Sequence, residues 1–264
     1  MSDSILYRRN VATKTLLMTA GVGMRLRPLT DRLPKCLVPI AGKPLLEYWF
    51  ERFAEAQLAE ILINTHHLPE RIRQFIDLAN QKGHSGCGFR VQEAFEPELL
   101  GSAGTVQKNR GFADDAETVL IIYSDNLSAI DLGQLLEFHE THDDPITMVV
   151  FRTETPERCG IAEVDSAMRI VDFVEKPSRP RGNLANAGIY AFRAEAFREV
   201  ADMAKFDIAF DVLPQFVGRM RAWEWQGYHL DIGTHESLAQ AEIDVAAGCL
   251  ALGYRRTVNW TPSK

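Results

Sequence analysis

The sequence lacks three features that would each point to a particular class of protein: a membrane-length apolar run, closely spaced cysteines and an excess of basic residues. Its longest apolar runs have the length of strands, so we expect no membrane-spanning segment. Its four cysteines form no CxxC pair, which fits neither a zinc site nor a small disulfide scaffold and favours a reducing cytoplasm. A formal net charge of −7 argues against a nucleic-acid partner, because nucleic-acid phosphates demand a basic surface.

What remains is the length and composition of a soluble enzyme. The chain has 264 residues, 46% of them hydrophobic and 25% charged, which is enough to bury a core without disulfides or a structural metal. The stretch from Met1 to Thr15 holds no apolar segment of signal-peptide length, and no Gly/Ser-rich linker divides the chain. We therefore expect an N-terminal extension over residues 1–14, one domain over residues 15–250 and a tail over residues 251–264.

Strand-sized apolar segments alternate with helix-period segments through the first half of the chain. Strands are expected there over residues 15–19, 61–64, 89–91 and 119–123, with helices from residue 45 and over residues 70–81, 103–108 and 132–139. The second half is richer in strands, expected over residues 147–151, 161–164, 170–174, 188–192 and 221–225, with helices over residues 194–200, 210–217 and 236–246. This order predicts an α/β fold with a doubly wound, mixed and mostly parallel sheet of the Rossmann-like kind. Ligands of such sheets bind beyond the carboxyl ends of the strands, here after Thr19, Tyr123 and Val174.

A glycine-rich loop with two basic residues follows the first strand. Gly21 and Gly23 let backbone N–H groups approach phosphate oxygens, and Arg25 and Lys35 add positive charge where an anion develops in phosphoryl transfer. A GxG turn alone is a weak signal. The GxxxxGK[ST] pattern is missing from the sequence, and GxGxxG fails because Leu26 occupies the third glycine's place. The longer pattern GxGxRLxPLT, followed by PKxLxPIxGxP, is far more specific.

This pattern resembles that of the sugar nucleotidyltransferases, a family that includes mannose-1-phosphate guanylyltransferases and glucose-1-phosphate thymidylyl-, uridylyl-, cytidylyl- and adenylyltransferases. The resemblance extends from residue 15 to about residue 246. It implies that the loop wraps a nucleoside triphosphate, that Arg25 holds the leaving pyrophosphate and that Lys35 contacts the phosphates at the reaction centre. The implied nucleotide-binding residues of the loop are Ala20, Gly21, Val22, Gly23 and Met24. Most relatives have Thr or Ser in place of Met24, so a hydroxyl contact to phosphate is lost here.

Two aspartates are the candidate metal ligands. Asp125 follows the fourth strand, and Asp231 lies in the segment YHLDIGT. Taken alone, each is explained more simply as a helix-capping or turn aspartate. In the family that the chain resembles, the matching carboxylates hold a metal, which implies Mg²⁺, since Mg²⁺ prefers one or two carboxylates with phosphate oxygens. Ser124 replaces the family's usual glycine and His235 its usual proline, and neither change removes a carboxylate.

Later segments resemble the family's sugar and base sites. The segments FVEKP and NAGIY imply that Glu175 contacts sugar hydroxyls, that Lys176 contacts the sugar phosphate and that Asn186 lines the sugar pocket. Gly160 matches the glycine that opens the preceding sugar-facing strand. The segment LLGSAGT resembles the family's LGTAGAL, where a glycine brings backbone against the base. Further implied nucleotide contacts are Gly101, Ser102 and Ser124, with Gln92 and Glu93 as weaker candidates; Ser102 is also expected to cap the helix behind it.

Two further pairs of residues favour structural roles. Adjacent His66 and His67 point to opposite sides of an extended chain, so we interpret them as loop residues and not as a metal site. Trp223 and Trp225 alternate along a strand and share one face, which favours packing over ligand stacking.

The implied reaction is attack by a sugar 1-phosphate oxygen on the α-phosphorus of a nucleoside triphosphate, with release of pyrophosphate. An inactive regulatory homologue would be expected to lose the loop's basic residues or a metal carboxylate, and this chain keeps them. A glycosyltransferase would have no use for a triphosphate loop. The segments IYSDN, EPELLGSAGT and NLANAGIY are nearest to mannose-1-phosphate guanylyltransferases, which favours GTP and mannose 1-phosphate. Heptose 1-phosphate, glucose 1-phosphate with other bases, and a homo-oligomeric state stay open.

Overall fold

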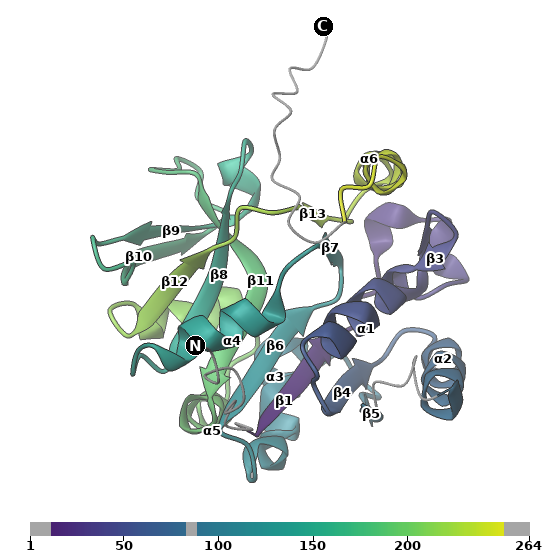
Figure 1. The fold of residues 1–264 in the computed structure, drawn as a ribbon, viewed down its shortest axis with the longest axis horizontal. Coiled ribbons are helices and arrows are strands. Elements are labelled where there is room, and N and C mark those ends of the chain that lie inside the picture. The colour runs from purple at the N-terminus through teal and green to yellow at the C-terminus, as the bar shows by residue number, and fades with distance from the viewer. Residues whose placement is uncertain (1–11, 83–88, 251–264) are drawn as a thin grey trace, which may run out of the picture.

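A nine-stranded mixed sheet forms the centre of the computed structural model, which describes residues 12–82 and 89–250 (Figure 1). Its strand order is β10-β9-β11-β6-β1-β4-β5, and β8 pairs with β11 and with β12. Most of the expected N-terminal extension (residues 1–14) and the whole of the expected tail (residues 251–264) lie outside these ranges. The sheet itself is the doubly wound, mixed sheet that the order of elements predicts.

The first half of the chain builds the parallel part of the sheet. Its strands are β1 (Thr13–Met18), β4 (Glu60–Thr65), β5 (Arg90–Phe95) and β6 (Thr118–Tyr123). Neighbours β6, β1, β4 and β5 all run in the same direction. Their carboxyl ends therefore lie at one edge of the sheet, where ligands of such folds bind. The expected third strand was too short, because β5 continues to Phe95.

The second half adds antiparallel strands on the other side of β6. They are β8 (Ile146–Arg152), β9 (Gly160–Val164), β10 (Ile170–Glu175), β11 (Leu184–Arg193) and β12 (Met220–Glu224). Strand β11 runs antiparallel to β6, β8 and β9, and β12 runs parallel to β8. The rings of Trp223 and Trp225, at the end of β12, pack 5.8 Å apart against the core, as their alternation predicts.

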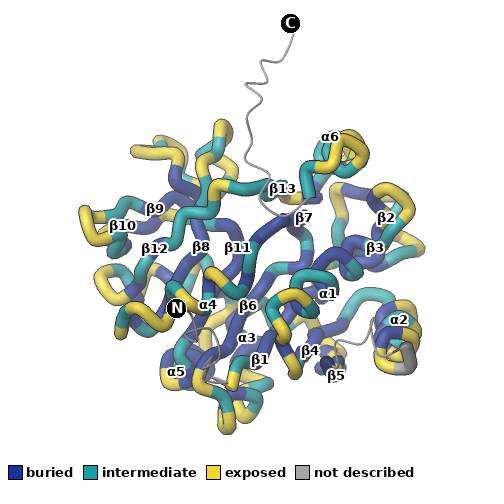
Figure 2. The backbone as a smooth tube through the Cα atoms, viewed as in Figure 1, coloured by how far each residue is buried: buried dark blue, intermediate teal, exposed yellow. Residues whose placement is uncertain are grey.

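Helices cover both faces of the sheet. Helices α1 (Leu45–Glu55), α2 (Pro69–Lys82) and α4 (Leu132–Glu140) lie on one face, and α3 (Gly101–Lys108) and α5 (Ala194–Asp202) on the other. Along β1, Leu16 and Leu17 belong to the opposite cores, because successive strand residues point to opposite faces. The strands are consequently buried on both sides, while the outer faces of the helices are exposed (Figure 2).

Short elements complete the chain. Two small antiparallel pairs join β2 (Pro39–Ile40) to β3 (Lys43–Pro44) and β7 (Asn126–Ser128) to β13 (His229–Asp231). The 3-10 turns are η1 (Met24–Leu26), η2 (Leu29–Asp31), η3 (Lys35–Leu37), η5 (Arg110–Ala113), η6 (Pro156–Arg158) and η8 (Leu213–Phe216). The helix expected over residues 210–217 is replaced by the π-turn η7 (Ile208–Val212) and by η8.

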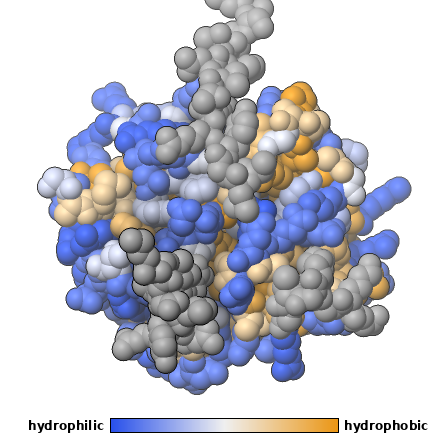
Figure 3. All heavy atoms as spheres, in the orientation of Figure 1, coloured by the Kyte–Doolittle hydropathy of each residue, from blue (hydrophilic) through white to orange (hydrophobic). Residues whose placement is uncertain are grey.

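Helix α6 (His235–Ala246) lies outside the sheet, above β7 and β13. Only Ala241 of this helix is fully buried, and Ile243 is 63% exposed. Figure 3 accordingly shows apolar atoms gathered over α6 on a surface that is otherwise largely hydrophilic in this view. Within the described residues, no helix has both the length and the apolar character needed to cross a membrane.

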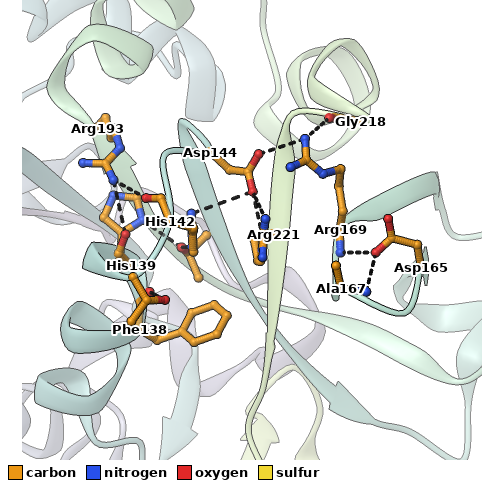
Figure 4. A network of polar contacts seen from close by, with 12 residues as sticks. Phe138, His139, His142, Asp144, Asp165, Ala167, Arg169, Arg193, Gly218 and Arg221 are labelled. Carbon is orange, nitrogen blue, oxygen red and sulfur yellow. Dashed lines mark hydrogen bonds and ion pairs between the residues drawn. The ribbon is translucent and has the colours of Figure 1, made fainter.

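The carboxylate of Asp144 anchors the turn between β9 and β10, which is the end of the hairpin away from Glu175. Asp144 is 7% exposed and accepts from Arg221 Nε at 2.8 Å, while its other oxygen lies 3.1 Å from Arg169 Nη1 (Figure 4). Arg169 sits in the hairpin turn, where its N–H donates to Asp165 Oδ1 at 2.9 Å. The hairpin that carries Glu175 is thereby fastened to the start of β8 and to β12.

Two histidines of the same network share one hydroxyl. His139 Nδ1 lies 2.7 Å and His142 Nε2 3.0 Å from Thr147 Oγ1 (Figure 4). Burial, together with the positive charge of Arg193, lowers the pKa of His139 to about 3. Burial also lowers the pKa of His142. The folded protein therefore keeps His139 neutral at pH values where the unfolded chain takes up a proton.

Because folded His139 stays neutral, we predict that the protein is less stable to unfolding at acidic pH. Below the unfolded pKa near 6.5 the unfolded state binds the proton of His139 and the folded state does not, so the free energy of unfolding falls as the pH falls. We expect His139 to account for a loss of about 2 kcal/mol between pH 7 and pH 5. Urea denaturation at both pH values measures it. The variant His139→Gln, which keeps a hydrogen-bonding group but does not titrate, should lose that part of the pH dependence; an unchanged dependence would contradict the assignment.

Candidate active site

Two neighbouring cavities open where the parallel strands end. The first, of about 320 Å³, is lined by the loop after β1 and by the start of α3, and we call it the loop cavity. The second, of about 250 Å³, is lined by the β9–β10 hairpin and by β11, and we call it the hairpin cavity. Tyr123, Asp125 and Asp207 line both cavities. Ligands in the two cavities would therefore meet at Asp125.

The glycine-rich loop is fastened by side chains at both ends. At its start, the Thr19 N–H donates to Asn64 Oδ1 at 2.7 Å, and the Thr19 hydroxyl donates to the Asn64 carbonyl. Further along, Thr30 Oγ1 donates to the Gly23 carbonyl at 2.8 Å. The loop thus has a fixed path before any ligand binds, which reduces the entropy lost when its N–H groups bind phosphate.

The adjacent histidines stabilise loops at this edge of the sheet. His66 Nδ1 lies 2.9 Å from the Glu96 carbonyl, and His67 Nε2 lies 2.8 Å from the Thr30 carbonyl. The two rings reach different partners, as expected for neighbours in an extended segment. His67 in particular holds the far end of the glycine-rich loop.

The expected nucleotide-binding residues of the loop divide into two groups. Ala20 and Gly21 line the loop cavity, and Gly21 is exposed. The loop cavity is not lined by the next three residues, Val22, Gly23 and Met24. The Met24 side chain is 69% exposed. The loop's contribution inside the cavity therefore comes from its first turn.

Lys35 and Asp125 face each other across the loop cavity. Lys35 Nζ donates to Asp125 Oδ2 at 2.8 Å, and the two side chains are 10% and 38% exposed. Asp125 does not cap the following helix. That role belongs to Asp131, whose Oδ1 accepts from the Gln134 N–H at 3.0 Å. The simpler structural explanation of Asp125 therefore fails.

Asp231 reaches the same place through the pairing of β7 with β13. The register sets Asp231 opposite Asn126, and the Ile232 N–H donates to the Asp125 carbonyl at 2.8 Å. Burial raises the pKa of Asp231, and the negative charge of Asp125 raises it further, against the opposing effect of nearby cations such as Lys35. The following helix, α6, is capped by another residue, so Asp231 has no capping role either.

Arg25 lies beside Asp231 at a close turn of the chain. A Cβ atom built on Gly233 would lie 2.3 Å from Asp231 Oδ1 and 2.7 Å from Arg25 Nη2. Both distances are too short for any side chain, so glycine is required for the carboxylate and the guanidinium to approach this turn. The structure thereby brings Arg25, Lys35, Asp125 and Asp231 together, as the sequence predicts.

The carboxylates of Asp125 and Asp231 are suitable ligands for a divalent cation. Phosphate oxygens of a substrate would complete the coordination of that cation. Burial raises the pKa of Asp231, and the negative charge of Asp125 beside it raises that pKa further. Mg²⁺ is typically bound by one or two carboxylates together with substrate phosphates. Among the residues described, no three His, Cys, Asp or Glu side chains form a complete metal cluster. Bound substrate or water would have to supply the remaining ligands.

The hairpin cavity collects the four residues expected to bind a sugar phosphate: Gly160, Glu175, Lys176 and Asn186. Gly160 pairs with Glu175 across the hairpin, and Lys176 Nζ lies 3.5 Å from Glu175 Oε1. Burial raises the pKa of Glu175, and the Lys176 charge opposes this rise. Asn186 Nδ2 donates to Tyr190 Oη at 2.7 Å, so the Asn186 side chain is held within the cavity wall.

The loop cavity also contains a buried carboxylate that the sequence analysis missed. Glu96 is 0% exposed, and its Oε1 accepts from Asn64 Nδ2 at 3.0 Å and from Thr105 Oγ1 at 2.5 Å. Glu96 Oε2 is buried and has no hydrogen-bond partner among the described residues. The relevant strand was expected to end at Val91. Since it ends at Phe95, Glu96 follows the carboxyl end of a parallel strand, where ligand-binding residues are expected.

Gly101 and Ser102 line the loop cavity, but the expected capping role of Ser102 is wrong. Helix α3 begins at Gly101 without a side-chain cap. Instead, Ser102 Oγ accepts from the Ile208 N–H at 2.8 Å and lies 3.2 Å from Asp207 Oδ2. Gly101 has a φ of +75°, and a Cβ there would lie 2.3 Å from the Phe206 carbonyl oxygen. Both residues thus hold the segment from Phe206 to Ile208 against α3.

Two other expected nucleotide contacts are less well placed. Gln92 lies in the middle of β5, opposite Leu62, and lines neither of the two cavities. Ser124 does line the loop cavity, but its hydroxyl donates to the Met18 carbonyl at 2.8 Å. Its side chain is therefore already hydrogen-bonded, and its role in the cavity is to shape the wall.

Comparison with known proteins agrees with this geometry. Residues 14–248 match the family model described as nucleotidyl transferase. The chain belongs to that family. It is 31% identical over 225 residues to the mannose-1-phosphate guanylyltransferase catalytic subunit beta of Danio rerio, covering 83% of this chain and 61% of the relative. It is 29% identical over 251 residues to a glucose-1-phosphate adenylyltransferase of Bacillus licheniformis, covering 87% and 66%.

The nucleotidyl transferase fold is also seen in a solved structure. A crystal structure from Bacillus anthracis, described as a glucose-1-phosphate thymidylyltransferase in complex with a sucrose, matches with a TM-score of 0.76 and 22% identity. The match covers 93% of this chain and 98% of that one. The chain spans less than two thirds of the length of the two curated relatives above. The two curated relatives are named for different bases, guanine and adenine, so the family alone does not fix the nucleotide.

The close contact at Gly101 generates a prediction about stability. Gly101→Ala places a methyl group against the Phe206 carbonyl oxygen and should cost on the order of 3 kcal/mol or more. Gly42→Ala is the matched control, since Gly42 has a φ of +77° with nothing within 4 Å of a Cβ, so it should cost on the order of 1–2 kcal/mol. Urea denaturation compares the two variants. Equal losses would show that the contact with Phe206 is unimportant.

Proposed function

We propose that this member of the nucleotidyl transferase family is a Mg²⁺-dependent sugar-1-phosphate nucleotidyltransferase, which converts a nucleoside triphosphate and a sugar 1-phosphate into a nucleotide sugar and pyrophosphate. The observation that carries the proposal is the position of Asp125. It lines both cavities, it pairs with Lys35, and its charge acts on Asp231. The spacing of the cysteines favours the cytoplasm as the place of this reaction.

The two cavities suit the two substrates. The loop cavity would hold the nucleotide, with its phosphates against the first turn of the glycine-rich loop and against Lys35 and Arg25. The hairpin cavity would hold the sugar 1-phosphate, with the phosphate at Lys176 and a hydroxyl donating to Glu175. The attacking oxygen and the α-phosphorus would then meet at the wall that both cavities share.

The chemistry needs charge and position more than proton transfer. The attacking phosphate oxygen is already anionic, so no general base has to remove a proton. Lys35, Arg25 and the loop N–H groups neutralise the charge that develops on the transferred and leaving phosphates. Asp125 and Asp231 would hold the Mg²⁺, which when bound supplies further charge neutralisation at the phosphates.

A pyrophosphate-release assay tests the proposal. The wild-type protein, with Mg²⁺, should release pyrophosphate from at least one pairing of GTP, UTP, CTP, ATP or dTTP with mannose, heptose or glucose 1-phosphate. Asp125→Asn removes a metal-binding charge and should lower turnover on the order of 1,000-fold, because the electrostatic contribution at the reaction centre is lost.

The matched control is Asp131→Asn. Asp131 lies six residues further along and caps α4, outside both cavities. Its replacement should leave turnover within a few-fold of wild type, because asparagine keeps the side-chain oxygen that caps α4 and the residue lies outside the site. Near-wild-type turnover of Asp125→Asn at saturating Mg²⁺ would rule out the metal assignment. A wild-type protein that is inactive with every pair would instead indicate a binding or regulatory homologue.

We further propose that the nucleotide is GTP, on the basis of Glu96. Its Oε2 is a buried acceptor that needs a donor. Guanine offers two neighbouring donors, N1–H and N2–H, on one edge, and Oε2 can accept from them while Oε1 keeps its hydrogen bonds from Asn64 and Thr105. In uracil and thymine, the single ring N–H lies between two carbonyl oxygens, and a carboxylate repels those oxygens. Adenine and cytosine place a ring acceptor beside their single amino group.

Replacing Glu96 should therefore change base preference. Glu96→Gln keeps an acceptor for Asn64 and Thr105 but can present an N–H group where Oε2 stood. We expect kcat/KM for GTP to fall on the order of 100-fold, with a smaller change for UTP and dTTP. Glu93→Gln is the control. Glu93 lies on the same strand but is paired with Thr65 and Arg73 and lines neither cavity. A uniform loss with all triphosphates would contradict the role of Glu96 in base selection.

A further inference from the structure

The segment that follows α5 lies between the two cavities and carries two exposed rings. Phe206 is 60% and Phe210 55% exposed, although Ile208 and Val212 of the same segment are fully buried. Phe206 lines the loop cavity, and Phe210 lines the hairpin cavity. An exposed aromatic residue is unremarkable by itself, but a ring in the wall of a cavity is available to a ligand.

The backbone that presents these rings is fixed. Asp207 Oδ1 accepts from the Phe210 N–H at 2.9 Å, and Asp207 Oδ2 lies within 3.2 Å of Ser102 Oγ, which donates to it. The Phe206 carbonyl accepts from the Ala103 N–H at 3.0 Å. The segment is thereby attached to the first turn of α3 on both sides of Asp207. Phe210 is therefore held at the cavity wall before any ligand binds.

The Phe210 ring lies beside the residue expected to bind the sugar phosphate. Lys176 Nζ lies 5.6 Å from the centre of the ring, which is a weak cation–π contact at an exposed site. A phosphate is a stronger partner for an ammonium group than a phenyl ring is, because the hydrogen bond is charge-assisted. An arriving phosphate would thus draw Lys176 toward itself and leave the ring face open.

We propose that Phe210 is a stacking platform for the sugar ring of the sugar 1-phosphate. This inference rests on the proposed function and adds a residue that selects the sugar. One face of a pyranose ring carries C–H groups, which pack against an aromatic face and remove apolar surface from water. Lys176 binds the phosphate, Glu175 accepts from a hydroxyl at the polar edge, and Phe210 covers the C–H face. The site therefore favours pyranose 1-phosphates with an unsubstituted apolar face.

Steady-state kinetics of the full chain tests this role, with mannose 1-phosphate and GTP as the probes. Phe210→Ala should raise the KM for mannose 1-phosphate about 3- to 10-fold, which corresponds to the loss of one aromatic contact, and leave the KM for GTP unchanged. Phe210→Tyr keeps the ring and should retain the wild-type KM. Phe210→Leu keeps apolar bulk without the ring and should behave like the alanine variant.

Phe206→Ala is the matched control, because Phe206 is equally exposed on the same segment but lines the other cavity. It should leave the KM for mannose 1-phosphate unchanged. An unchanged KM for mannose 1-phosphate in Phe210→Ala, or equal increases for both substrates, overturns the stacking role while the wild-type activity stands. If wild type releases no pyrophosphate from any pair of substrates, the proposed function itself fails. Circular dichroism verifies that the variants are folded.

Discussion

The antiparallel pairing of β7 with β13 is the contact on which the site depends. Each strand has three residues, and they come from distant parts of the chain. The Ile232 N–H donates to the Asp125 carbonyl, and the register places Asp231 opposite Asn126. Asp125, which follows β6, and Asp231, which ends β13, are thereby held close together. Without this pairing, Asp125 would face Lys35 alone, and the proposed metal site would have one carboxylate instead of two.

Holding Asp125 and Asp231 close together places two carboxylates where they repel each other. Burial and the Asp125 charge both raise the pKa of Asp231, so holding the second carboxylate there costs free energy. A divalent cation, if held there as proposed, would offset that repulsion and would favour the binding of phosphate oxygens. Lys35 and Arg25 attract the same phosphates from the loop side. Cation and nucleotide should therefore bind cooperatively, since each relieves an electrostatic cost that the other would otherwise meet.

The sequence revealed the chemistry of the site more fully than its selectivity. Arg25, Lys35, Asp125 and Asp231 could be found because short motifs surround each of them, and the alternation of apolar segments predicted the doubly wound sheet. Glu96 was missed because β5 extends beyond the apolar residues that mark its start, and the end of a strand is poorly defined by local pattern. Phe210 could not be found at all. Its position depends on Asp207, which accepts from the Phe210 N–H and from the hydroxyl of Ser102, a residue distant in sequence.

The same division explains how one fold can serve different substrates. The β7–β13 pairing joins Asp125 to Asp231, so a change there would disturb the charge balance of the candidate site. Glu96 lines the loop cavity and Phe210 the hairpin cavity, and both lie on segments that the β7–β13 pairing does not include. A substitution at either position can alter a contact to base or sugar without moving Asp125. Selectivity could therefore change by single side chains while the reaction stays the same, which fits a family with members named for guanylyl and adenylyl transfer.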